Sequence, residues 1–220
     1  HPERSMNPVW SPDSRWIAYA RRLDTQLRAI YVHDTESGET HQLTDGMADA
    51  ITPVWDEGGK YLYFLASTDY GLNTGWLDMT SYDRPITRAL YVTLLRADEP
   101  SPFLPKSDEE ESAEDGESDD AESEEEESDE EESDEDADSG GDQQSPGRGG
   151  DQASDGVQVE IDFDGINRRI IDVPGLPTRD YVGLERGPEG SVFVAEAPEG
   201  FGGASLLKYT LDDREAGDFI

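Results

Sequence analysis

The chain of 220 residues contains no cysteine, which excludes a disulfide framework and thiolate chemistry. Basic residues are scarce: 17 Lys and Arg stand against 53 Asp and Glu, and the formal net charge is −36. Because a nucleic acid or an anionic membrane surface is bound through basic patches, we expect neither as a partner. Long apolar runs are also missing, so no segment of the sequence is expected to span a membrane.

Most of the negative charge lies in one segment, residues 107–156. This segment holds 25 acidic residues and a single basic one, so it contributes −24 to the net charge and leaves −12 for the rest of the chain. It has almost no apolar side chains whose burial would offset the entropy lost on ordering. We therefore predict an acidic, disordered insertion between two folded parts, residues 1–106 and 157–220.

Acidic residues at regular spacing suggest a calcium site. Asp134, Asp136 and Asp138 match the first ligand positions of an EF-hand loop, but Ser139 stands where that loop requires glycine. A second weak spacing, at residues 162–167, is explained more simply by a turn. We therefore predict no metal ion and no cofactor.

The sequence does contain one motif written twice. Residues 8–19 read PVWSPDSRWIAY and residues 53–64 read PVWDEGGKYLYF, at an offset of 45 residues. A repeat of about 40–50 residues is typical of a β-propeller, in which each repeat is one four-stranded antiparallel blade. A third, weaker copy begins at Tyr181. We predict an all-β fold of about two and a half blades, which belong to an incomplete ring.

Alternating or continuous apolar residues indicate the strands within each copy. The expected strands cover residues 16–20, 28–34, 40–44, 53–55, 61–66, 88–95, 157–163, 169–173, 191–195 and 206–211. A turn at Asp164-Gly165 is expected to join the two strands that follow the acidic segment. The third copy is predicted to stop before a fourth strand, and no helix longer than one turn is expected.

Trp10 and Trp55 occupy equivalent positions in the two copies. Because a propeller blade buries both of its faces against neighbouring blades, we predict that both indoles pack between blades.

A catalytic triad would need Ser11 with His33 or His41 and one of many aspartates. The stretch from Ser11 reads Ser-Pro-Asp-Ser, whose residue types are those of a turn. The two histidines face each other across a predicted hairpin, and no nucleophile elbow is present. We therefore assign no catalytic residue.

The segment of residues 67–87 is the strongest candidate for a functional site. Loops of about twenty residues inside compact folds are uncommon and are often functional. Aromatic rings can grip an extended peptide, and charged groups can bind its ends. The candidate substrate-binding residues are Asp69, Tyr70, Trp76, Asp78, Tyr82, Asp83 and Arg84. The alternative is a self-packed loop whose aromatic side chains cover the blade.

The motif of residues 8–19, followed by IYVHDTESGETHQLT at residues 30–44, resembles the blades of TolB-like and tricorn-type propellers. Residues 58–111, which include Tyr-Asp-Arg-Pro at 82–85, and residues 159–166 resemble the last part of the second propeller of bacterial tricorn protease homologues. That family consists of large serine peptidases with two propellers, a PDZ-like domain and a separate catalytic core.

The resemblance implies a noncatalytic propeller segment that gates or channels peptides to a catalytic core outside this chain. Its partners would be peptide or unfolded polypeptide substrates and the remaining blades and catalytic domains of the same chain, with homo-oligomer formation left open. The alternative is a TolB-like propeller that binds a protein and has no enzyme attached.

The compartment is not fixed by the sequence. Because the chain begins with His1, we expect the natural N-terminus to lie outside it. The tricorn resemblance implies the cytoplasm, with the periplasm or secretion as alternatives.

Overall fold

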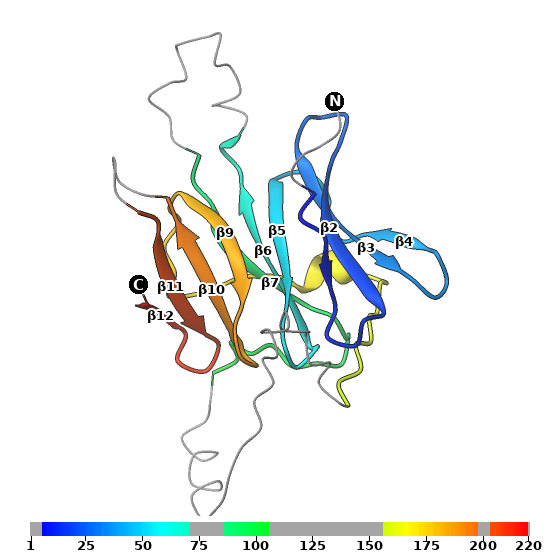
Figure 1. Cartoon of the computed structure of the whole chain (residues 1–220). Coiled ribbons are helices and arrows are strands. Elements are labelled where there is room, and N and C mark those ends of the chain that lie inside the picture. The colour runs from blue at the N-terminus through cyan, green and yellow to red at the C-terminus, as the bar shows by residue number, and fades with distance from the viewer. Residues whose placement is uncertain (1–5, 71–85, 106–155, 198–202, 220) are drawn as a thin grey trace, which may run out of the picture. The chain divides into compact units, whose positions relative to one another are not determined.

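The computed structural model describes residues 6–70, 86–105, 156–197 and 203–219. In these ranges the chain forms strands joined by turns, with a short 3-10 helix, η3 (Ile166–Arg169). The strands make three four-stranded antiparallel sheets, each with its strands side by side in chain order (Figure 1). These sheets are β-propeller blades, and the predicted all-β class is confirmed. No helix in the described ranges is long and apolar enough to cross a bilayer.

Blade 1 consists of β1 (Val9–Trp10), β2 (Trp16–Arg22), β3 (Arg28–Asp34) and β4 (Thr40–Gln42). Burial alternates along β2 as the sequence predicts, with Trp16, Ala18 and Ala20 buried on one face. The turn between β3 and β4 uses Gly38 at φ 76°, the left-handed conformation that glycine adopts without strain.

Blade 2 consists of β5 (Asp49–Trp55), β6 (Tyr61–Ser67), β7 (Ala89–Leu94) and β8 (Ile170–Asp172). All seven residues of β5 are buried, as expected for a strand held between two neighbouring blades. The register of β5 against β6 shifts between Ile51 and Val54, next to Pro53. Proline has no N–H to donate to a ladder, and a bulge at this point accommodates it.

Blade 3 consists of β9 (Tyr181–Arg186), β10 (Ser191–Glu196), β11 (Ser205–Thr210) and β12 (Glu215–Asp218). The sequence predicted no fourth strand here, yet β12 pairs with β11 along its whole length. The strand reads Glu-Ala-Gly-Asp and carries no apolar alternation, since it lies at an edge. The three sheets are therefore complete, and the count of about two and a half blades was too low.

The prediction of a strand at residues 157–163 was wrong. This segment alternates in sequence, but it joins no sheet and runs irregularly between blades 1 and 2. Its side chains contribute to the core shared by those blades: Val159 is buried, and the partly buried Ile161 and Phe163 pack against the same core. The predicted turn at Asp164-Gly165 exists, but it leads into η3 instead of closing a hairpin.

Two apolar cores join the three blades, and β6 contributes to both. Leu62 and Phe64 enter the core between blades 1 and 2, whereas Tyr63 and Leu65 enter the core between blades 2 and 3. This division follows from the two-residue period of a strand, which sends successive side chains to opposite faces. Blade 2 is thus covered on both faces, which explains its nearly continuous apolar strands.

The described residues between 6 and 104 and between 156 and 219 belong to one compact unit. Nearly all of the acidic segment, residues 107–156, lies outside the described ranges, so its disorder stays a prediction.

Candidate functional site

The predicted functional loop, residues 67–87, begins at the end of β6 and returns just before β7. Of its candidate residues, the structure describes Asp69 and Tyr70. The others lie outside the described ranges: Trp76, Asp78, Tyr82, Asp83 and Arg84. Their substrate-binding role remains a prediction.

Asp69 closes the stem of this loop. One of its carboxylate oxygens accepts a hydrogen bond from the Thr87 hydroxyl at 2.7 Å, and the other accepts one from the Thr87 backbone N–H at 3.2 Å. The Ser67 hydroxyl donates to the same carboxylate. Burial alone would raise the pKa of the Asp69 carboxyl, but the hydrogen bonds from Ser67 and Thr87 together lower it. One charged residue, Asp69, therefore holds the two ends of the loop together.

Tyr70, the next residue, lies against a cation from blade 1. The Arg28 guanidinium carbon is 5.3 Å from the centre of the Tyr70 ring. Arg28 also donates its Nε and its backbone N–H to Asp49 Oδ1, each at 2.9 Å. Asp49 is fully buried at the start of β5, so this ion pair holds blade 1 against blade 2.

Arg88 extends these contacts to blade 3. Its Nη1 donates to the carbonyl oxygen of Tyr181 at 2.9 Å and lies 3.6 Å from a carboxylate oxygen of Asp180. Burial, and then the charge of Arg28, lower the pKa of Arg88. We call these charged groups the loop-stem cluster: Arg28, Asp49, Asp69, Arg88 and Asp180.

The loop-stem cluster joins all three blades at the end of the sheets where the 67–87 loop starts (Figure 1). The sequence did not predict it, because its members are far apart in the chain and belong to three different blades. The described residues contain no group of three or more His, Asp or Glu side chains placed to hold a metal ion. The contacts fix the two ends of the 67–87 loop to the blades.

The residues of the triad hypothesis have other partners. The Ser11 hydroxyl accepts a hydrogen bond from the Trp16 backbone N–H at 2.9 Å, which is a turn contact. His33 Nδ1 is 2.9 Å from a threonine hydroxyl on β4. The His41 ring stacks on Phe163 at a centroid distance of 3.8 Å. Ser11 therefore serves the turn between β1 and β2.

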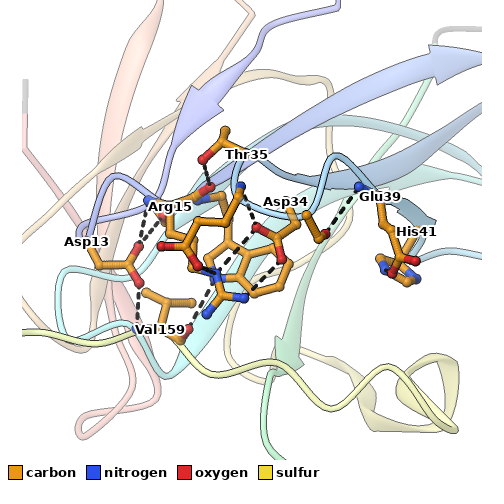
Figure 2. Close-up of polar contacts among 11 residues, drawn as sticks. Asp13, Arg15, Asp34, Thr35, Glu39, His41 and Val159 are labelled. Carbon is orange, nitrogen blue, oxygen red and sulfur yellow. Dashed lines mark hydrogen bonds and ion pairs between the residues drawn. The ribbon is translucent and has the colours of Figure 1, made fainter.

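A second polar network fastens the chain to blade 1 where it returns from the acidic segment (Figure 2). The Val159 backbone N–H donates to Asp13 Oδ2 at 2.9 Å, and the Val159 carbonyl accepts from the Trp16 indole N–H at 3.1 Å. Arg15 lies over the Trp16 ring and pairs with Asp34 at 2.9 Å. The hydrogen bond from Arg15 holds the pKa of Asp34 well below its usual range.

The same returning segment is also attached to blade 2. The Asp162 backbone N–H donates to the Leu95 carbonyl at 2.9 Å, and Arg96 pairs with Glu160 at 3.1 Å. A Cβ placed on Gly59 would lie 2.9 Å from a methyl carbon of Val157, so a larger residue there would push the segment away. The segment that follows the acidic insertion is thus fixed to both blades, independently of the length of the insertion.

Parts of this chain are similar in sequence to known proteins. No protein-family model matches the chain. The uncharacterized peptidase YuxL of Bacillus subtilis is 30% identical over 81 residues, which are 37% of this chain and 12% of that protein. The Tol-Pal system protein TolB of Alcanivorax borkumensis is 33% identical over 67 residues, which are 30% of this chain and 15% of that protein.

Among solved structures, the tricorn protease matches 97% of this chain and 18% of its own, with a TM-score of 0.55 and 16% sequence identity. The chain therefore spans less than a fifth of the length of each of these proteins. At such low identity the structural similarity shows the propeller fold alone. At that level, the resemblance to tricorn-type and TolB-like propellers is confirmed.

Proposed function

We propose that the chain is a noncatalytic propeller segment of a tricorn-like serine peptidase and handles polypeptide substrates for a catalytic core outside the chain. The observation that carries this proposal is the extent of the match to the tricorn protease, which covers 97% of the chain, across all three blades. The partial sequence match to a peptidase adds independent support.

Two uncovered sheet faces support the presence of further blades. Blade 2 docks on blade 1 through Trp55, whose indole N–H donates to the Val9 carbonyl at 3.1 Å. Trp10 stands at the same repeat position, but it is 56% exposed, on a face of blade 1 that no described sheet covers. Blade 3 likewise exposes Val182 and Phe219. A ring of blades would bury both faces.

The proposed mechanism is selection of substrates by shape. A ring of blades admits an extended chain and excludes a folded one, and the 67–87 loop leaves and rejoins the blades at one end of the sheets, between β6 and β7. The loop-stem cluster fixes the base of that loop to three blades. The propeller therefore acts on entry of the substrate and leaves the chemical step to other residues. The purified chain is expected to hydrolyse no peptide.

The test compares long and short substrates in the full-length protein. Asp83→Ala and Arg84→Ala are assayed on an unfolded polypeptide and on a short fluorogenic peptide, with Asp164→Ala as a control for loss of an exposed charge. We expect slower turnover of the polypeptide and unchanged turnover of the short peptide. Equal losses on both substrates, or no change on either, would contradict the proposal.

A second candidate is a TolB-like module that binds a protein and carries no enzyme. The 33% identity to TolB over 67 residues favours it. The reading frame that contains this chain separates the two: a PDZ-like region and a catalytic core in the same frame support the peptidase, and their absence from the frame supports the binding module.

A further inference from the structure

A pocket of about 320 Å³ opens between blades 1 and 2. Its floor is formed by buried residues of β5 and β6, Ala50, Phe64 and Ala66. Its outer wall is formed by Tyr91 of β7 and Ile170 of β8. The Tyr91 ring stacks on Phe64 at a centroid distance of 5.6 Å, so the wall is a packed aromatic surface. We call this cavity the wedge pocket.

The wedge pocket exists because the residues around it are small. Ala48, Ala50 and Ala66 line it where longer side chains would fill the space between two diverging blades. The outer strand of blade 1, β4, has only three residues, and none of them lines the pocket. Met47 stands at the pocket with 80% of its surface exposed. The cavity is thus apolar inside and open to an incoming side chain.

One charged group lies in the lining. Asp45 is exposed, and its Oδ1 accepts a hydrogen bond from the Met47 backbone N–H at 2.9 Å. None of the ion pairs found in the described part of the chain includes Asp45. The remaining polar lining is neutral, from Thr44, Thr68 and Asn167. A ligand with an apolar body and an adjacent positive charge would complement this arrangement.

We propose that the wedge pocket binds one large apolar side chain of an extended polypeptide whose neighbouring residue is Lys or Arg. The apolar side chain would occupy the space between Ala66 and Tyr91, and the cation would pair with Asp45. This inference rests on the proposed function, since it names a preference among the polypeptides handled by the propeller. The acidic charge of the chain also disfavours an anionic ligand.

The test uses the methyl group of Met47 as a local probe. The chain has three methionines, so a spectrum of 13C-methyl methionine is simple, and Met47→Leu identifies the signal. The probes are three blocked peptides with glycine flanks and a central Lys-Phe, Gln-Phe or Lys-Ala pair. We expect Lys-Phe to shift the Met47 signal by the ring current of the bound phenyl group and to leave Met6 unchanged. Gln-Phe should bind more weakly, and Lys-Ala should cause no ring-current shift.

Two variants test the charge of Asp45 and the space inside the pocket separately. Asp45→Asn keeps an acceptor for the Met47 N–H but removes the charge, so it should weaken Lys-Phe binding about two- to fivefold and leave Gln-Phe binding unchanged. Asp212→Asn, on blade 3, is the matched control and should change neither. Ala48→Leu fills the pocket and should abolish the Met47 shift while the methionine spectrum stays that of the folded chain.

Several results would overturn the proposal: no Met47 shift with Lys-Phe at millimolar concentration, equal binding of Gln-Phe and Lys-Phe, or binding that survives Ala48→Leu. A Met47 shift that depends on protein concentration alone would instead mean that a second copy of the chain occupies the pocket. Failure of the long-substrate assay with an intact Met47 response would contradict the proposed function and leave the wedge pocket standing.

Discussion

Two tryptophans at one repeat position lie in different surroundings. Trp55 is 1% exposed and donates its indole N–H to blade 1, whereas Trp10 is exposed on the outer face of blade 1. The prediction that both pack between blades is confirmed for Trp55 and does not hold for Trp10 within the described residues. The repeat gives the two residues the same role, but among the described residues only Trp55 is covered by a neighbouring blade.

This pair allows a matched test of packing. Trp55→Ala should lower the free energy of unfolding by about 3–5 kcal/mol, because it leaves a cavity and removes a buried hydrogen bond. Trp10→Ala in the same chain should cost about 1 kcal/mol or less, since it loses only cross-strand contact. Urea denaturation of both variants measures the difference. Similar losses would show that Trp10 is covered in this chain.

The Arg15–Asp34 pair makes a prediction about pH. Asp34 has a lowered pKa in the folded protein, so its ion pair stabilises the fold fully above the unfolded value, about 3.9. That stabilisation is lost as the pH falls from there through the lower folded value. Asp34→Asn should therefore be less stable than the parent at pH 7, and the difference should shrink in acid. Urea midpoints between about pH 7 and pH 2.5 measure this, with Asp24→Asn as the exposed control; a constant difference would contradict it.

At the scale of the elements, the sequence predicted strands well where apolar residues face a core. It predicted β2, β3 and β6 because their side chains alternate between a buried and a second packed face. It missed β12, which is held by backbone pairing at a polar edge. It predicted a strand at residues 157–163 because side chains buried between two sheets produce the same alternation as side chains on a sheet.

The sequence likewise predicted neither the loop-stem cluster nor the wedge pocket. Arg88 contacts Tyr181, 93 residues later, and no local pattern signals that contact. The pocket depends on small residues such as Ala66, which in the sequence look like ordinary strand positions. The sequence predicted the 67–87 loop from its length and composition. It did not predict the contact between Asp69 and Thr87 at the base of the loop, because a hydrogen bond across eighteen residues has no sequence signature.

The anchoring of the returning segment predicts that the acidic insertion is dispensable for folding. Replacing residues 108–155 by a Gly-Ser linker of about twelve residues should keep or slightly raise the melting temperature, since each halving of a loop lowers the closure cost by about 0.6 kcal/mol. Val159→Ala should instead cost about 1–3 kcal/mol, because Val159 is buried between two blades. Thermal melts of both variants test this, and a large loss on replacing the insertion would show that it packs against the blades.

At the scale of the whole molecule, the described residues form three blades, of which the first and the third each leave one face uncovered. Blade 2 is buried on both faces, whereas blades 1 and 3 each have one face without a neighbouring sheet in the described residues. Exposed aromatic and aliphatic side chains mark both ends, including Trp10, Val182 and Phe219. Apolar faces of this kind on sheets are normally covered by another element. These uncovered faces support the proposal that further blades lie against them, on which the proposed handling of polypeptides depends.

The most direct test is cysteine labelling of the two ends. The chain has no cysteine, so single Trp10→Cys and Val182→Cys variants, with Thr25→Cys as an exposed loop control, give one labelled site each. The reaction rate with a thiol reagent is measured in the isolated chain and, by peptide mapping, in the protein of the full reading frame. We expect fast labelling of all three variants in the isolated chain and, in the longer protein, strong protection of the Trp10→Cys and Val182→Cys variants alone. Equal labelling of all three variants in both proteins would contradict it.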